Sequence, residues 1–288
     1  MDKSFVGQWP SSSEQWVPTL LQLTAHLKEG GGGGAALRRW FEIGFDSLGG
    51  ELRSNVLDMA HNQASQAVGP VKGISAALFS GHLGSTGYQE RRREYSPSTW
   101  QEFLAELENL PRMASLELFA LNSNGMPVNP SMLISSQRFG HAGEWLTLAI
   151  MIKPQLQPDD GRWPPALDLL KRTAETVEVS HGSISFLDSI FSTPLELALH
   201  MPSEDAIPRS RKLLRGYGWI TILGEEMGTR LGGETGLRNT GAFAEVAHLS
   251  NGGFWLKATS FLGAYRGPQA EKVRSVLAPL LPNAGYVK

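Results

Sequence analysis

The amino-acid sequence contains no cysteine. Disulfide bonds, thiolate metal sites and a cysteine nucleophile are therefore excluded. The N-terminal residues 1–16 lack the long apolar core of a secretory signal peptide. No stretch approaches the roughly 18 apolar residues that a membrane span needs. We therefore expect a cytoplasmic protein without a membrane partner.

The sequence also lacks a strong excess of either charge. Its 26 basic and 28 acidic residues leave a net charge of −2, which provides no electrostatic drive toward nucleic acid. Direct binding of nucleic acid is not expected. The 41% hydrophobic and 19% charged residues are ordinary for a soluble globular protein.

Standard catalytic and cofactor motifs are missing as well. The seven histidines are widely spaced and form no HExxH pattern, so no metal site is expected. No Gly-Lys dipeptide suggests a phosphate-binding loop, and no GxSxG suggests a hydrolase nucleophile. Gly30 to Gly34 with Ala35 formally match GxGxxA, but they follow an expected helix rather than a strand. We interpret these glycines as a flexible loop, and we expect neither a cofactor nor catalytic residues.

Residues 215–259 are the best-marked stretch of the chain. Tyr217 to Leu223 are apolar and typical of a strand, and Gly224 ends that strand. Glu225 and Glu226 then stand where a helix would begin, a position that favours carboxylates. Two further strands, 243–249 and 254–259, flank an Asn-Gly pair that predicts a hairpin.

The rest of the chain mixes helices and strands. Trp16, Leu20, Leu23 and Leu27 recur at helical spacing, which predicts a helix from Ser11–Ser13 to about Lys28. Residues 81–95 and 122–130 are expected to be loops. Residues 144–152 are apolar at nearly every position, as in a central strand buried on both faces. Further strands are expected at 4–9, 72–80, 115–121 and 179–186, and further helices at 35–43, from 96, from 164 and from 268.

This order predicts an α+β fold of mainly antiparallel sheets with helices packed on them, arranged as two lobes. Three prolines and a mixed charge cluster mark residues 188–214. We place a boundary there, which gives an N-terminal lobe of residues 1–205 and a C-terminal lobe of residues 206–288.

Several segments resemble known bacterial immunity proteins. FVGQWP, WVPTLLQLTAHL and ALRRWFEIG resemble the opening of the immunity protein 52 family, and VKGISAALFSGH, LELFALN and EWLTLAIMI resemble its later strands. GYGWITILG, LGGETGLR and GGFWLKAT resemble the last part of the TsiV-like (DUF3396) immunity proteins. Together these segments span most of residues 4–282.

The resemblance implies a cytoplasmic protein that binds and silences a toxin of a type VI secretion system. In these families the toxin is often a nuclease with a PD…(D/E)xK site. This chain has Pro158-Asp159 but no following Asp/Glu-x-Lys in a suitable element, so it does not look like the toxin itself. The resemblance transfers no catalytic residues and no toxin contacts.

Acidic residues are the candidates for partner binding, because acidic groups can steer an inhibitor toward a basic nuclease cleft. The candidates are Asp159, Asp160, Glu225, Glu226 and Glu234. The alternative is that the first pair lies in a solvated turn and the second begins a helix. Arg91 to Arg93 and the basic residues 209–215 lie beside acids and are interpreted as self-neutralised loops.

Two other functions remain open. The chain could be an enzyme that acts on a small molecule or on the toxin, with an unrecognised active site. It could instead be a structural partner in a secretion or biosynthetic gene cluster. Protection by much less than one equivalent would favour the enzyme.

Overall fold

The computed structural model describes residues 18–28, 32–64, 73–84 and 87–282. Within these residues a single ten-stranded sheet has the order β3-β2-β4-β5-β6-β1-β7-β8-β10-β9. Its strands are β1 (Thr19–His26), β2 (Ile74–Gly84), β3 (Gly87–Glu94), β4 (Met113–Leu121), β5 (Pro127–Phe139), β6 (Trp145–Lys153), β7 (Glu178–Phe186), β8 (Ile220–Leu223), β9 (Glu245–His248) and β10 (Phe254–Lys257).

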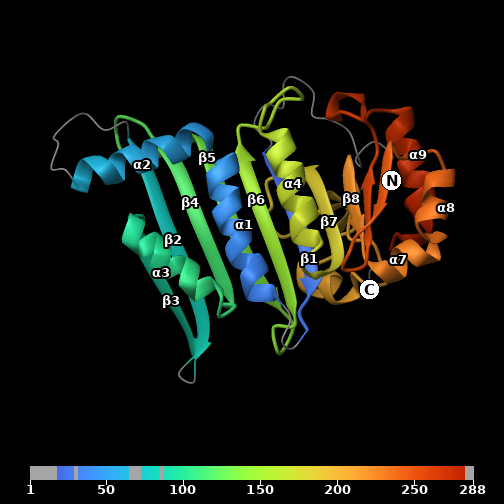
Figure 1. Cartoon of the computed structure of the whole chain (residues 1–288), viewed down its shortest axis with the longest axis horizontal. Coiled ribbons are helices and arrows are strands. Elements are labelled where there is room, and N and C mark those ends of the chain that lie inside the picture. The colour runs from blue at the N-terminus through green and yellow to red at the C-terminus, as the bar shows by residue number, and fades with distance from the viewer. Residues whose placement is uncertain (1–17, 29–31, 65–72, 85–86, 283–288) are drawn as a thin grey trace.

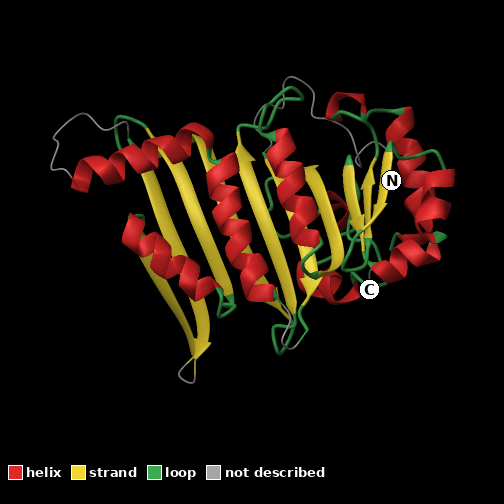
Figure 2. Ribbon diagram, in the orientation of Figure 1, coloured by secondary structure: helices red, strands yellow, loops and turns green. Residues whose placement is uncertain are grey.

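Helices cover one face of this sheet along much of its length (Figure 1). The helices of the described residues are α1 (Gly33–Leu48), α2 (Gly50–Ala64), α3 (Pro97–Leu107), α4 (Trp163–Ala174), α5 (Pro194–Ala198), α6 (Ser203–Ala206), α7 (Glu225–Arg230), α8 (Gly233–Asn239) and α9 (Pro268–Leu277), with the short 3-10 helices η1 (Ile207–Arg209), η2 (Leu262–Ala264) and η3 (Ala278–Leu280). Helices α1 to α4 lie on the same face of the sheet, over strands β2 to β7, and α2 runs across the strands at one end of the sheet (Figure 2). We call the face beneath them the helical face.

The main apolar core lies between these four helices and the helical face. Alternate residues of several strands enter it, such as Leu116 and Leu118 of β4 and Leu146 and Leu148 of β6. They meet apolar helix residues that include Trp40, Phe41, Phe103 and Leu170, all at most 1% exposed. Burial of this area is the main force that holds the layers together.

The other side of the sheet, which we call the second face, is covered unevenly. Over β6, β1 and β7 it is covered by the chain that connects β7 to β8, residues 187–219. The Gln22 side chain of β1 donates a hydrogen bond of 2.8 Å to the Ile190 carbonyl of this segment. A small apolar cluster ties the same segment to β5 and β6 and consists of Phe139, Trp145, Phe191 and Ile207.

Local sequence signals explain several elements. Ser96 and Thr99 form a reciprocal capping box at the start of α3, and Pro97 occupies its first turn. The Ser250–Gly253 segment joins β9 and β10 as an antiparallel hairpin. Strand β6 is buried at nearly every position between β5 and β1, so the expected central strand is confirmed.

The helix predicted from Ser11 to Lys28 is wrong over the part of this segment that the structure describes. Residues Thr19–His26 form β1, which pairs with β6 on one side and β7 on the other. Residues of a strand buried on both faces need not alternate, so Leu20 and Leu23 matched helical spacing by coincidence. Residues 11–17, and the strand expected at 4–9, lie outside the described residues.

Three expected loops are also wrong in part. The segment expected as a loop at 81–95 contains the end of β2 and all of β3, an exposed edge strand with the sequence GYQERRRE. Its charged residues resemble those of an exposed loop. Charged residues are, however, common on edge strands, where they prevent pairing with a strand of another molecule. Strand β5 begins at Pro127, inside the loop expected at 122–130, and α1 begins at Gly33, inside the expected glycine loop.

The α+β class with antiparallel pairing is confirmed, because every strand pairing in the described sheet is antiparallel. The sheet itself continues across residue 205 through the pairing of β7 with β8. The division into lobes 1–205 and 206–288 stays a prediction. No helix of the described residues is long and apolar enough to cross a membrane.

Candidate functional site

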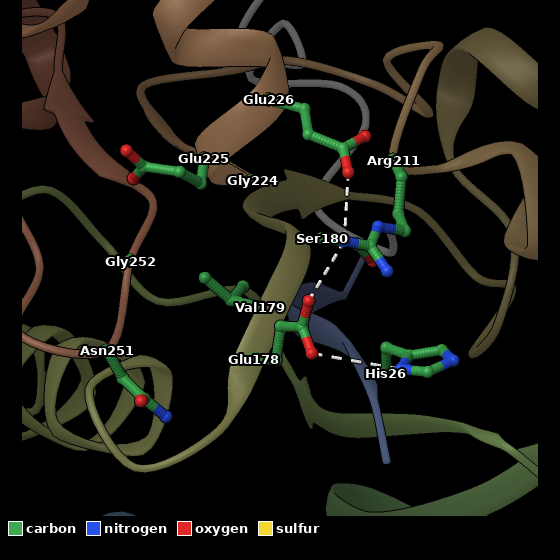
Figure 3. Close-up of a pocket in the computed structure, with 10 residues that line it drawn as sticks. All are labelled: His26, Glu178, Val179, Ser180, Arg211, Gly224, Glu225, Glu226, Asn251 and Gly252. Atoms are coloured by element: carbon green, nitrogen blue, oxygen red, sulfur yellow. Dashed lines mark ion pairs between the residues drawn. The ribbon is translucent and has the colours of Figure 1, made fainter. Parts of the chain in front are cut away.

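A cleft opens where β1 ends and β7 begins (Figure 3). Antiparallel pairing places His26, the last residue of β1, opposite Glu178, the first residue of β7. Arg211 reaches this point from the loop after η1, and Glu226 reaches it from the first turn of α7. The turn between β9 and β10 closes another side with Asn251. Five parts of the chain thus meet in one cleft.

Glu178 is the centre of the charges in this cleft. Arg211 Nη2 lies 3.0 Å from Glu178 Oε1 and 2.9 Å from Glu226 Oε1, so one guanidinium bridges two carboxylates. Lys28 Nζ lies 3.1 Å from Glu178 Oε2, and His26 Nδ1 lies 3.8 Å from the same oxygen. The cluster is partly exposed, with 24% of the Glu178 side chain and 40% of the Arg211 side chain accessible. Solvent therefore screens these pairs, and their contribution to stability is small.

A hollow of about 260 Å³ continues from the cleft past His26. Lys28, Thr176, Glu178 and Asn251 line it together with backbone at Gly32 and Gly33. The His26 ring is held edge-on against Trp145, with ring centres 5.0 Å apart. Such a lining suits a small polar group that forms hydrogen bonds, such as a side chain of a partner protein.

Among the described residues, no group of three or more histidine, aspartate or glutamate side chains is arranged so that it could hold a metal ion. The Ser180 hydroxyl beside the cleft donates to the Thr24 carbonyl at 3.1 Å and lies 2.8 Å from Ser210 Oγ. It is therefore engaged in the packing of the second face. A serine that is activated by a neighbouring base is not found at this point.

Of the five acidic candidates from the sequence, Glu225 and Glu226 belong to the cleft. They do not act alike, however. Glu225 turns toward the β9–β10 turn, where it accepts a 2.9 Å hydrogen bond from the Gly253 amide and lies 2.9 Å from His248 Nε2. The hydrogen bond from Gly253, followed by that from His248, lowers the pKa of Glu225 below its ordinary value. Glu225 thus fastens the hairpin to α7, whereas Glu226 faces Arg211 (Figure 3).

The other three candidates do not line the cleft. Asp160 binds Arg162 through both carboxylate oxygens, at 3.0 and 2.7 Å, and this hydrogen bonding lowers its pKa. Asp159 is exposed in the turn after β6. Glu234 pairs with Arg238 one turn later on α8, at 2.6 Å. Whether any of the five candidates contacts a partner stays a prediction.

The sequence reasoning missed His26, Glu178 and Arg211. They lie in three segments that are far apart in sequence, and no local motif links them. Only the pairing of β1 with β7 brings the first two together. The spacing of apolar residues predicts a helix in place of β1, and a helix has no strand pairing that could bring His26 and Glu178 together.

Comparison with known proteins identifies a similar fold but does not assign the chain to a family. No protein-family model matches the sequence, and no curated protein matches it. Among solved structures, the T6SS protein PA0821 of Pseudomonas aeruginosa is similar, where T6SS denotes the type VI secretion system. The likeness covers 96% of this chain and 78% of that chain, with a TM-score of 0.53 and 12% sequence identity.

This likeness shows a shared fold over nearly the whole chain. At 12% identity it does not extend to shared residues or to a shared activity. The resemblance to the immunity protein 52 and TsiV-like families accordingly stays a prediction.

Proposed function

We propose that this chain is an immunity protein of a type VI secretion system. It binds a cognate secreted toxin, expected to be a restriction-endonuclease-like nuclease, and neutralises it by forming a stoichiometric complex in the cytoplasm. The observation that carries the proposal is the fold shared with a T6SS protein over 96% of the chain. The sequence resemblance to immunity proteins points in the same direction.

The charges of the cleft support binding rather than catalysis. Glu178 is held by Arg211 and Lys28, Glu226 by Arg211, and Glu225 by His248. A general acid or base has to reach the substrate with a free proton or lone pair. Each of these carboxylates is already bound to a neighbouring side chain.

The test is a titration of this protein into the product of the neighbouring effector gene, with binding and nuclease activity read in parallel. A stable complex needs an interface of about 1,600 Å² in total. We expect tight binding and complete inhibition near one equivalent. A wild-type protein that neither binds the effector nor inhibits it would contradict the proposal.

The second candidate is an enzyme that modifies a small molecule or the toxin. The observation in its favour is the hollow of about 260 Å³ beside His26 and Glu178, which is large enough for a small substrate. Protection of toxin at a small fraction of an equivalent, lost in a His26→Ala variant, would establish this alternative. Retained one-to-one inhibition by the same variant would exclude it.

A further inference from the structure

We propose that the second face of strands β3, β2 and β4 is the docking surface for a partner protein whose surface is basic and carries an apolar anchor. This inference rests on the proposed function, because it names the part of the molecule that the toxin would cover. It differs from the acidic candidates of the sequence analysis, none of which lies on these strands.

The strand registers define the surface in rows across the sheet. Arg92 of β3 pairs with Phe79 of β2, which pairs with Ser115 of β4. In the next row Glu94 pairs with Ala77, and Ala77 pairs with Glu117. Paired residues of antiparallel strands point to the same side. Because Ala76, Leu78, Leu116 and Leu118 enter the core on the helical face, these rows point to the second face.

No helix buries this part of the second face among the described residues. The helices packed against β2 and β4 are α2 and α3, which contribute to the core on the helical face. Phe79, Glu117 and Phe119 consequently stay partly exposed. The second face of β1 is instead covered by residues 187–219, and Thr24 of β1 is fully buried there. The described residues therefore cover the second face over β1 and leave it uncovered over β3, β2 and β4.

The uncovered surface carries large apolar and aromatic groups. Tyr88, which is 47% exposed, lies across Gly81, where a methyl group would overlap its ring. The Arg92 guanidinium lies over the Phe79 ring, 5.2 Å from its centre. The register adds Met113, Phe119 and Leu133 to the same side. Aromatic residues, methionine and arginine are the residues enriched at protein interfaces.

This surface carries more acidic than basic side chains. Glu90, Glu94 and Glu117 face it beside a single guanidinium, that of Arg92. None of the three carboxylates forms an ion pair with a described residue, whereas most other acidic side chains of the described chain do. Desolvation raises the pKa of Glu117 above its ordinary value, and Arg92 offsets this only in part. A partner's lysine or arginine would supply the missing opposite charge.

The size of the surface also suits part of a protein interface. Three strands, each about 4.8 Å wide, over about eight residues of about 3.3 Å each, cover roughly 400 Å². A standard interface covers about 800 Å² on each partner. The surface is thus large enough for the centre of an interface. A face that carries acidic and apolar side chains fits a basic protein surface with an apolar anchor best.

The first experiment locates the interface on the wild-type protein. Carboxylates are labelled with carbodiimide and glycine ethyl ester, with and without one equivalent of the neighbouring effector, and labelling is read by mass spectrometry. We expect the effector to protect Glu90, Glu94 and Glu117 severalfold. Asp58, an exposed carboxylate of α2 on the helical side, should label equally in both samples.

The second experiment reverses charge. The double variant Glu94→Lys/Glu117→Lys places like charges against a basic partner, and we expect at least a tenfold increase in Kd. The matched control is Asp58→Lys, which should bind like the wild type. Circular dichroism and thermal unfolding establish that both variants are folded.

The outcomes separate this inference from the proposed function. Wild-type binding with unprotected Glu94 and Glu117, and with an unchanged Kd for the folded double variant, overturns the docking surface and leaves the immunity function standing. No binding by the wild-type protein overturns both. Protection of Asp159, Glu226 or Glu234 instead would move the interface to the acids that the sequence had indicated.

Discussion

Arg215 and Glu196 form an ion pair in the covered part of the second face. The two side chains are 1% and 0% exposed, and Arg215 Nε lies 2.6 Å from Glu196 Oε1. Arg215 Nη1 also donates to Thr24 Oγ1 at 2.6 Å, and Arg215 Nη2 donates to the Phe191 carbonyl at 2.7 Å. The pair therefore fastens the segment between β7 and β8 to strand β1.

We expect Glu196→Ala to lower the free energy of unfolding by about 3–5 kcal/mol, because it leaves the Arg215 charge buried without its partner. Urea denaturation followed by tryptophan fluorescence measures this change. The control is Glu234→Ala, which removes an exposed pair and should lower stability by at most about 1 kcal/mol. Equal losses in the two variants would contradict the structural role of the buried pair.

His181 of β7 is a second buried titratable residue near this pair. It is 0% exposed, and neither ring nitrogen has a hydrogen-bond partner among the described residues. Burial, reinforced by the positive charge of Arg215, lowers the pKa of His181 well below its ordinary value of 6.5. The ring is therefore neutral in the folded protein, whereas in the unfolded chain it takes up a proton below about pH 6.5.

This difference predicts a loss of stability in acid. Below about pH 6.5 the unfolded state binds one more proton than the folded state, so the free energy of unfolding falls by up to about 1.4 kcal/mol per pH unit. We expect His181→Leu to flatten this slope between the unfolded and folded pKa values, whereas His141→Leu, at an exposed position, should not. Urea denaturation at a series of pH values measures the slopes. If the slope of the free energy of unfolding against pH is unchanged in His181→Leu, the buried neutral state assigned to His181 is wrong.

Among the secondary-structure elements, the start of α1 explains part of the glycine run. Helix α1 begins at Gly33, and a methyl group at Gly34 would overlap the Glu108 carbonyl oxygen after α3. At Gly32 the same group would meet no atom within 4 Å. The two neighbouring glycines therefore have different roles, since only Gly34 permits the close approach of α1 to the end of α3.

We expect Gly34→Ala to lower the free energy of unfolding by about 1–3 kcal/mol, because the backbone of residue 108 would have to shift. The matched control is Gly32→Ala, which should change stability by about 0.5 kcal/mol or less. Midpoints of urea unfolding give both values. A Gly34→Ala protein as stable as the wild type would show that α1 and α3 pack less closely than described.

Elements with strong local signals were predictable, and elements defined by pairing were not. Helix α3 has its own capping box, and the hairpin of β9 and β10 has its own Asn-Gly turn. Strand β1 lacks such a signal, and its identity depends on partners about 125 and 160 residues away. Strand β3 is polar because it lies at the edge of the sheet, so its composition resembled that of a loop.

At the scale of the whole molecule, the sheet and the core are continuous. Strand β8 pairs with β7 across the boundary that the sequence suggested near residue 205. The same apolar cluster includes Leu21 and Leu148 as well as Trp255 and Leu280. In this arrangement the C-terminal strands share their hydrogen bonds and apolar contacts with the larger part of the sheet.

We therefore expect a single cooperative thermal transition for the described sheet rather than two. Differential scanning calorimetry tests this by comparing the calorimetric enthalpy of unfolding with the van't Hoff enthalpy, which should agree. Two resolved transitions, or a calorimetric enthalpy well above the van't Hoff value, would favour independent lobes at 1–205 and 206–288.

By itself, the sequence determined the α+β class, the central strand β6, the capped helix α3 and the hairpin after α7. These features depend on composition and on residues that are neighbours along the chain. Of the candidate cleft, the sequence indicated only Glu225 and Glu226, which belong to one local motif. The tertiary structure alone decided the position of β1, the meeting of His26 with Glu178 and Arg211, and the acidic face of β3, β2 and β4 that the described residues leave uncovered. These depend on strand register between segments far apart in sequence, which no local pattern encodes.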